Sequence, residues 1–315
     1  MTGQAERRLV VIDCDPGIDD ALAILYLAAD PGVELVAIGT VDGNVEPELG
    51  AENALRALEM ADLRSVPVAV GARSPLLQPS RHAEYFHGQD GLGDSALPPP
   101  GRSPSTESAV EQLVRLARLH PGALSLLAIG PLTNVALALS LEPDLPELLR
   151  EVVIMGGAVF GPGNESPWAE FNIAHDPEAA EIVLRARWRH SVLVGLDATR
   201  QAILDLEGES KLAEAGSAQA RFALAMLNQQ MRANSQFELC DPLAAGILAD
   251  PSLATYRPMP VSVELEGRHT RGATIADRRV TLAEVVETRP QVQVAMQVDS
   301  RRFLGTFRRR LGAPE

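Results

Sequence analysis

Residues 13–20 read Asp-Cys-Asp-Pro-Gly-Ile-Asp-Asp and follow directly on a short apolar run, residues 9–12. A run of this length and composition is typical of a buried parallel strand. Residues 19–29 then carry apolar side chains at helical spacing, and Asp-Pro-Gly ends that segment. A second aliphatic run, residues 35–41, comes next. The stretch therefore predicts a strand, a helix and a second strand.

This alternation of strands and helices continues to about residue 200, with further aliphatic runs at residues 66–70, 124–129, 152–155 and 192–196. It predicts an α/β fold: a single domain over residues 1–315 with a mostly parallel, doubly wound, Rossmann-like sheet flanked by helices. Ligands of such sheets bind beyond the carboxyl ends of the strands. We therefore expect the functional site there.

The remaining third of the chain is expected to complete the same domain. It contains a helical stretch at residues 212–234, an expected turn at residues 240–242, and alternating strands at residues 261–265 and 292–298. Two earlier segments, residues 74–106 and 156–167, are rich in Gly and Pro and are expected to be long loops. Loops of this length often carry binding residues.

Composition excludes several classes of function. The 315 residues are 46% hydrophobic and carry a formal net charge of -14, which disfavours binding to nucleic acid or to anionic membranes. Only Cys14 and Cys240 are present, and their spacing fits neither a disulfide scaffold nor a zinc ribbon. No apolar stretch has the length of a signal peptide or membrane span, so we expect a cytoplasmic protein with a small-molecule ligand.

Four aspartates meet at the turn after the first predicted strand. Asp13 and Asp15 lie on one face of an extended segment, and Asp19 and Asp20 open the helix. Like charges this close repel one another, and a bound cation is the simplest way to keep them ionised. Oxygen ligands without a His or Cys pattern favour calcium or magnesium over zinc. Helix capping is the competing explanation, although one carboxylate suffices for a cap.

Residues 11–21 resemble the signature of the inosine-uridine preferring nucleoside hydrolase family. Further segments resemble later motifs of that family in the same order, so the resemblance spans nearly the whole chain; they are residues 128–134, 155–157, 169–172 and 241–242. The resemblance implies the fold predicted above, cleavage of the N-glycosidic bond of purine or pyrimidine ribonucleosides, Ca²⁺ as the cofactor, and assembly as a homodimer or homotetramer.

The resemblance also implies roles for individual residues. Asp19 occupies the position of the general base, which takes a proton from a calcium-bound water. Asp13 would contact the calcium ligands rather than the ion itself. The implied calcium ligands are three carboxylates and one backbone carbonyl: Asp15, Asp20, Asp241 and Ile129. The positions that would hold the nucleoside are Asn44, His87, Met155, Asn164, Glu170 and Asn172.

Several of these positions have plausible structural explanations. Asn164 has the setting of an ordinary turn residue, Met155 that of a core residue, and a histidine in a loop such as His87 is commonly a surface residue. Many family members place a His before the last calcium-ligating Asp, where this chain has Cys240. Cys is the weaker acid at neutral pH. The departing base would then be assisted by His87, by His82 or His175, or by solvent.

Two other functions stay open on the sequence alone. Asp-x-Asp after a first strand also opens phosphatases of the haloacid dehalogenase type, which use an aspartyl nucleophile and magnesium. The Pro16-Gly17 pair and the adjacent Asp19 and Asp20 argue against that class. A nucleoside-binding protein without catalysis is the other alternative, suggested by Cys240, although binding alone would not need Asp19.

Overall fold

The computed structural model describes residues 7–277 and 289–313. Within these residues nine strands form one sheet in the order β10-β9-β11-β6-β5-β4-β1-β2-β3. The six strands from β3 to β6 are parallel to their neighbours and are the runs expected from the sequence: β1 (Arg8–Cys14), β2 (Val33–Thr40), β3 (Val68–Val70), β4 (Leu124–Ala128), β5 (Glu151–Met155) and β6 (Ser191–Val194). The predicted mostly parallel, doubly wound sheet is confirmed.

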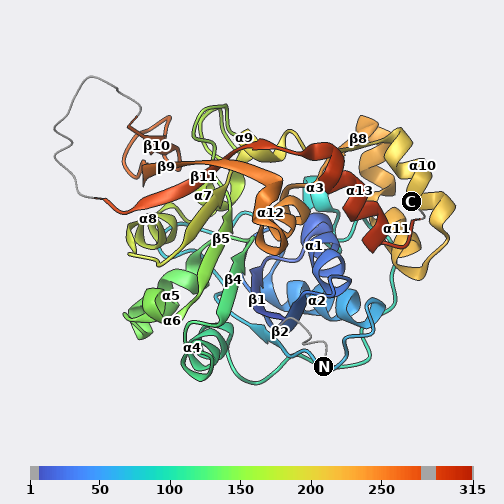
Figure 1. Ribbon diagram of the computed structural model, residues 1–315, viewed down its shortest axis with the longest axis horizontal. Helices are drawn as coiled ribbons and strands as arrows, with labels where there is room; N and C mark the ends of the chain where they lie inside the picture. Colours follow the sequence, from blue (N-terminus) through green and yellow to red (C-terminus); the bar gives the residue numbers. More distant parts are fainter. Residues whose placement is uncertain (1–6, 278–288, 314–315) are drawn as a thin grey trace, which may run out of the picture.

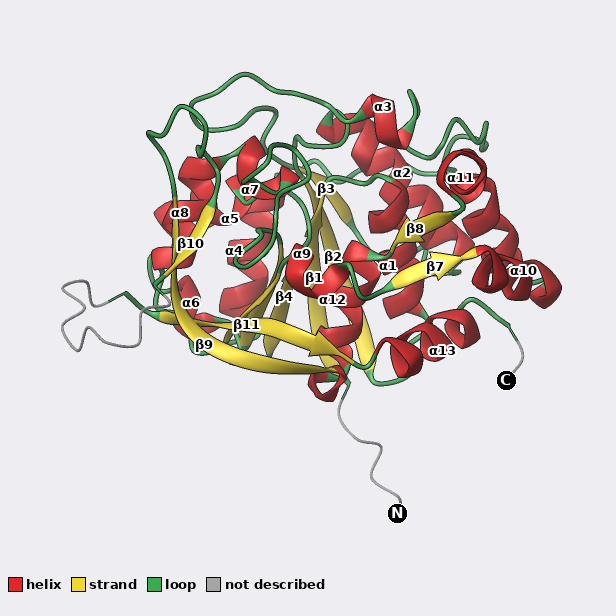
Figure 2. Ribbon diagram, turned by 90° about the horizontal axis from the view of Figure 1, so that it is seen from above, coloured by secondary structure: helices red, strands yellow, loops and turns green. Residues whose placement is uncertain are grey.

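Three later strands extend the same sheet beyond β6. They are β9 (Ala254–Val263), β10 (Thr274–Ala276) and β11 (Gln291–Val298). Strand β11 is parallel to β6 and antiparallel to β9, and the two long strands run side by side at the margin of the molecule in Figure 2. Strands β7 (Ile203–Asp205) and β8 (Gln236–Glu238) form a separate antiparallel pair.

Helices cover both faces of the sheet, and each face has its own apolar core (Figure 1). One core includes α4 (Ala109–Leu119), α5 (Thr133–Leu141), α6 (Leu145–Leu148) and α8 (Pro177–Arg185). The other includes α1 (Ile18–Ala28), α2 (Pro47–Met60), α10 (Leu206–Ala215), α11 (Ala218–Asn234), α12 (Cys240–Ala249) and α13 (Ser300–Arg310). The short elements are α3 (Glu84–His87), α7 (Phe171–His175), α9 (Leu196–Thr199) and the 3-10 helix η1 (Pro251–Leu253).

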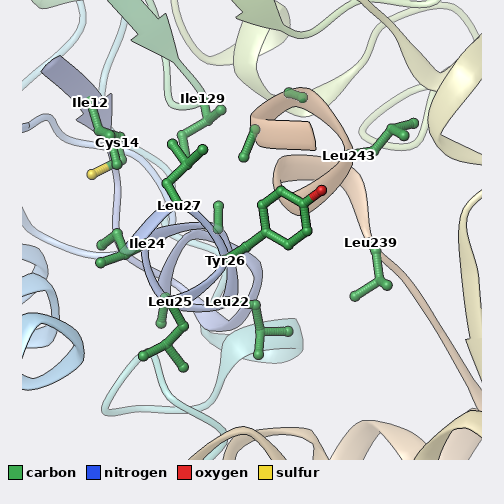
Figure 3. Close-up of a cluster of buried hydrophobic side chains, with 14 of the residues drawn as sticks. Ile12, Cys14, Leu22, Ile24, Leu25, Tyr26, Leu27, Ile129, Leu239 and Leu243 are labelled. Carbon is green, nitrogen blue, oxygen red and sulfur yellow. The ribbon is translucent and has the colours of Figure 1, made fainter. Parts of the chain in front are cut away.

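Helix α1 is buried on nearly every side. Figure 3 shows its side chains, among them Leu22, Tyr26 and Leu27, pointing outward in all directions into the core. The Tyr26 ring stacks on Phe307 of α13 with ring centroids 6.3 Å apart. A helix that is apolar all round is stabilised by burial rather than by an amphipathic pattern. The buried helix therefore holds the acidic turn at its amino end in a fixed position.

Two expectations about the last third of the chain are wrong. Residues 240–242 do not form a turn but begin α12, because Pro242 lies in the first helical turn, where a missing backbone N–H is tolerated. The stretch at residues 212–234 is two helices rather than one, since Gly216 adopts the left-handed conformation with φ 61° and Ser217 caps α11. Across the described ranges, no helix is both long and apolar enough to cross a membrane.

Candidate active site

The predicted site residues gather at the point where the strand order reverses, between β1 and β4. The acidic turn follows β1 and Ile129 follows β4, and the N–H of Ile129 donates to the carbonyl of Asp13 at 2.8 Å. Asn44 comes after the neighbouring strand β2, and Met155 ends β5. A reversal of strand order leaves a crevice at the carboxyl ends of the strands. The residues named from the sequence therefore lie at the edge of the sheet where they were expected.

Three carboxylates from two distant parts of the chain come together in this crevice. Asp19, Asp20 and Asp241 each offer an oxygen, and these atoms all lie within 4.8 Å of one another. Asp19 and Asp20 are in the first turn of α1 and Asp241 in the first turn of α12. The packing of α1 against α12 thus brings together residues that are more than 200 positions apart in the sequence.

Asp15 lies beside this cluster rather than within it. Its backbone N–H donates to Oδ1 of Asp20 at 3.2 Å, while its own Oδ2 accepts the backbone N–H of Asn44 at 2.7 Å. The backbone packs closely around it, since a Cβ at Gly43 would lie 2.1 Å from Oδ2 and one at Gly130 would lie 2.7 Å from Oδ1. Gly43 and Gly130 were missed as functional residues. Their requirement depends on tertiary contact with Asp15.

The cluster, together with the nearby Asp13 and Asp15, offers oxygen atoms suited to a hard cation. Oδ2 of Asp13, Oδ1 of Asp15 and Oδ1 of Asp19 are buried and have no hydrogen-bond partner among the described residues. An unpartnered buried polar atom is costly, and a divalent ion would satisfy it. The all-oxygen set therefore fits calcium or magnesium and gives no reason to expect zinc.

The protonation of the carboxylates leads to the same conclusion. Burial raises the pKa of Asp19 to about 8 and that of Asp20 to about 6, and the charge of Asp20 adds to the rise at Asp19. Burial also holds the pKa of Asp15 and of Asp241 well above the ordinary range, with neighbouring carboxylates contributing. A cation among these groups reverses the effect, because it favours the ionised forms.

Asp13 is not one of the three clustered carboxylates. Its Oδ1 accepts a hydrogen bond from Nδ2 of Asn134 at 2.8 Å, and the same amide donates to the carbonyl of Thr40 at 2.9 Å. Burial raises the pKa of Asp13 to about 7. Asn134 thus fixes the end of β1 against the end of β2.

The predicted sugar-binding residues form one wall of the crevice. Glu170 caps α7, since its carboxylate accepts backbone N–H groups of Asn172 at 2.9 Å and of Ile173 at 3.1 Å. The Asn172 amide donates to the carbonyl of Ile129 at 2.8 Å and reaches Met155 O at 3.3 Å. The structure therefore brings Asn172 to the predicted calcium-ligating carbonyl and joins it to Glu170 and Met155.

Asn44 and Asn164 differ in their surroundings. The Asn44 amide is buried and donates to Oδ2 of Asp20 at 3.3 Å, which places it in the acidic site. Asn164 is exposed, and its Oδ1 accepts the backbone N–H of Phe171 at 2.9 Å. Asn164 therefore holds its loop to α7 in this structure, and its side chain does not join the buried cluster.

His87 lies over the amino end of α1. It is 5% exposed, and burial lowers its pKa to about 3. Its Nδ1 accepts the backbone N–H of Ile18 at 3.1 Å, so the ring is neutral and carries its proton on Nε2. Cys240 is half-buried at the start of α12, and burial together with the charges of Asp19 and Asp241 raises the pKa of its thiol. Neither group is a strong acid in this arrangement.

A further buried carboxylate, Asp42, was not predicted. Its Oδ1 lies 2.9 Å from Nε2 of His82, and its Oδ2 lies 3.0 Å from Nε2 of His175. Its position just after β2, at the same edge of the sheet as Asn44, was a signal that could have found it. Its two histidine partners come from segments far away in the sequence.

Nearly the whole chain is similar to known proteins of one family. Residues 10–305 match the model of the family described as inosine-uridine preferring nucleoside hydrolase. A protein of that name from Leishmania major is 37% identical over 303 residues, which are 94% of this chain and 95% of the relative.

Solved structures agree with this similarity. A plant nucleoside hydrolase has a TM-score of 0.92 and 32% identity, with 98% of this chain and 99% of that chain covered. A purine-preferring ribonucleoside hydrolase from Gardnerella vaginalis has a TM-score of 0.90 and 32% identity, with 97% and 98% covered. The Leishmania relative is named for inosine and uridine, and the Gardnerella enzyme for purine ribonucleosides.

Proposed function

Because this chain belongs to the inosine-uridine preferring nucleoside hydrolase family and is an N-ribohydrolase, we propose that it works with calcium and uses Asp19 as its general base. The proposed calcium ligands are the carboxylates of Asp15, Asp20 and Asp241 and the carbonyl of Ile129. The observation that carries the proposal is the cluster of Asp19, Asp20 and Asp241, whose oxygens lie within 4.8 Å of one another.

Calcium, when bound, supplies the positive charge that keeps these carboxylates ionised and makes a neighbouring water more acidic. Asp19 is suited to take the proton, because its Oδ1 is buried and has no hydrogen-bond partner in the part of the chain that is described. An ionised carboxylate within hydrogen-bond reach of the attacking water acts as a general base. Without a cation, Asp19 would be protonated more readily and could not act as a base.

The sugar is proposed to lie against Asn44, Glu170 and Asn172, with Met155 beside it and Asn164 at the outer loop. Amide and carboxylate groups can hold the ribose hydroxyls in one orientation, which directs the attacking water to the anomeric carbon. Glu170 is already fixed by its backbone hydrogen bonds, so this wall is preorganised before the substrate arrives.

The departing base needs a proton or a hydrogen bond. His87 keeps its proton on Nε2 and is neutral, so we propose that it donates a hydrogen bond to the base while solvent supplies the proton. His82 and His175 both direct Nε2 to Asp42, which removes those nitrogens from the reaction. Cys240 then packs beside Asp241 as a protonated thiol.

The proposal is tested with purified protein stripped of metal and supplied with inosine, guanosine, uridine and cytidine. Release of ribose and free base on addition of Ca²⁺ is the expected result. Binding of a nucleoside without release of ribose would instead support the binding protein that lacks catalysis. Equal activity in the presence of excess chelator would contradict the calcium requirement.

The phosphatase alternative is wrong, because the relatives and structural neighbours are N-ribohydrolases.

We also propose that residues 1–315 form one domain, that the protein is cytoplasmic, and that it assembles as a homodimer or homotetramer. The single large sheet draws strands from residues 8 to 298, which supports one domain. Both cysteines are free, as expected in a reducing compartment. Light scattering tests the assembly, and a monomer at working concentration would contradict it.

A further inference from the structure

The buried carboxylate of Asp42 lies where three segments of the chain meet. Asp42 is 2% exposed and follows β2. Its two oxygens contact different histidines, His82 at 2.9 Å and His175 at 3.0 Å, both through Nε2. His82 belongs to the loop of residues 74–106, and His175 ends α7.

Each of these three segments also carries a proposed nucleoside-binding residue. Asn44 is two positions after Asp42, α3 and His87 follow His82 closely, and Asn172 is on α7 with His175. The backbone supports the same junction, because the N–H of Ala83 donates to the carbonyl of Asn44 at 3.0 Å. Asp42 therefore joins segments that must keep their relative positions for the sugar and base to be held together.

The chemistry of the junction favours an ionised Asp42. Burial alone would raise the pKa of Asp42, yet hydrogen bonds from His175, Ser80 and His82 outweigh it and hold the pKa below its ordinary value. Both imidazoles can donate from Nε2 while neutral, so the arrangement needs no additional charge. Hydrogen bonds to an ionised acceptor are shorter and stronger than those between neutral groups.

A metal ion does not explain this group. In the described ranges, the residues whose ligand atoms lie close enough together to hold an ion are Asp19, Asp20 and Asp241. Asp42, His82 and His175 do not form such a group among the described residues. The direct hydrogen bonds between the side chains are therefore the basis of its role.

We propose that Asp42, through His82 and His175, is a positioning residue that holds the His87 loop against the sugar-binding segments. This inference rests on the proposed function, since it assumes that His87 and Asn172 act on one nucleoside. Other contacts hold the rest of the loop: Gln78 donates to the carbonyl of Ala174 at 2.6 Å, and Asn53 donates to that of Asp90 at 2.9 Å. Loss of the His82 contact should loosen the middle of the loop without unfolding it.

The first experiment uses His82→Ala, because the His82 side chain is 24% exposed and its removal leaves Asp42 paired with His175. We expect KM for the best nucleoside to rise on the order of tenfold, with kcat changed by less than about threefold and calcium affinity unchanged. His82→Gln should recover much of the loss, since its amide can donate to Asp42. His190→Ala, at an exposed histidine just before β6, is the matched control and should behave as wild type.

The second measurement does not depend on activity. Amide hydrogen exchange in residues 79–88 should be faster in His82→Ala than in wild type and unchanged in His190→Ala. If the wild type released no ribose, the proposed function would fail, yet the exchange data would still report on the junction. Wild-type KM together with wild-type exchange in His82→Ala would overturn the inference.

A double-mutant cycle separates the junction from a general loss of packing. Asp42→Ala and His82→Ala each remove the contact between Asp42 and His82, so the double variant should raise KM little more than Asp42→Ala alone. Fully additive effects of the two changes would show that Asp42 and His82 act independently, and the inference would then be wrong.

Discussion

Nδ1 of His87 accepts a hydrogen bond from the backbone N–H of Ile18 at 3.1 Å, and Ile18 is the first residue of α1. An acceptor nitrogen carries no proton, so the position of the loop in this structure, which we call closed, requires a neutral ring. The amino end of a helix also disfavours positive charge. The position of the His87 loop and the protonation of His87 are therefore linked.

This link predicts that the loop opens as the pH falls. Burial lowers the pKa of His87 to about 3 from the ordinary value of 6.5. Below pH 6.5 the His87 ring is therefore protonated when the loop is open and stays neutral when the loop is closed. The closed form is thus fully stable above that value and becomes progressively less stable as the pH falls from about 6.5 toward about 3. Hydrogen exchange in α3, compared at about pH 7.5 and about pH 5.5, should show the opening.

His87→Gln is the control for this prediction. The Gln carbonyl oxygen can accept the same N–H of Ile18 and does not titrate. Its α3 exchange, corrected for the intrinsic effect of pH, should not respond to acid. An equal response in the variant and the wild type would show that His87 is not the group responsible.

Gly17 is predicted to be required for the same contact. A Cβ at residue 17 would lie 2.5 Å from Nδ1 of His87, and no side chain fits at that distance. Gly17→Ala should therefore displace the His87 ring and raise KM by about tenfold or more. The matched control is Gly305→Ala in α13, where the nearest atom is 3.5 Å from the added Cβ. That change should leave KM unchanged and stabilise the fold by up to about 1 kcal/mol.

The sequence predicted the parallel part of the sheet because each strand is a local apolar run, and it placed the site because Asp15, Asp19 and Asp20 follow the first strand directly. The start of α12 was harder to predict. Proline is common in turns but is also tolerated in the first turn of a helix. Pro242 takes the second place because α12 packs against α1, and that packing is a tertiary contact.

The contacts of Asp42 with His82 and His175 could not be predicted from local patterns. His82 and His175 are 93 positions apart, and neither has a sequence context that indicates a shared partner. The same is true of Gly43, whose lack of a side chain matters only because Asp15 packs against it. Such contacts depend on the tertiary fold rather than on periodicity.

Removal of Asp241 is predicted to weaken calcium binding. Asp241→Ala takes away one of the three clustered carboxylates and leaves Asp19 and Asp20 in place. Calorimetry on chelator-stripped protein should show calcium affinity lower by at least about tenfold. Asp250→Ala, at the opposite end of α12, should bind calcium as the wild type does. Unchanged affinity in Asp241→Ala would remove this residue from the proposed ligands.

Asp19→Asn is predicted to separate metal binding from catalysis. The amide keeps the size of the side chain but cannot take a proton from the attacking water, so kcat should fall by about 100- to 10,000-fold. Calcium affinity should stay within about threefold of wild type, because Asp15, Asp20 and Asp241 are intact. Single-turnover ribose release and calorimetry measure the two quantities on the same samples.

The control for Asp19→Asn is Asp144→Asn, an exposed aspartate before α6 that lies far from the carboxylate cluster. It makes the same chemical change and should keep wild-type kcat. A near wild-type kcat in Asp19→Asn would show that another group activates the water. Loss of calcium and of turnover together would instead make Asp19 a ligand, which its place in the cluster with Asp20 and Asp241 also permits chemically.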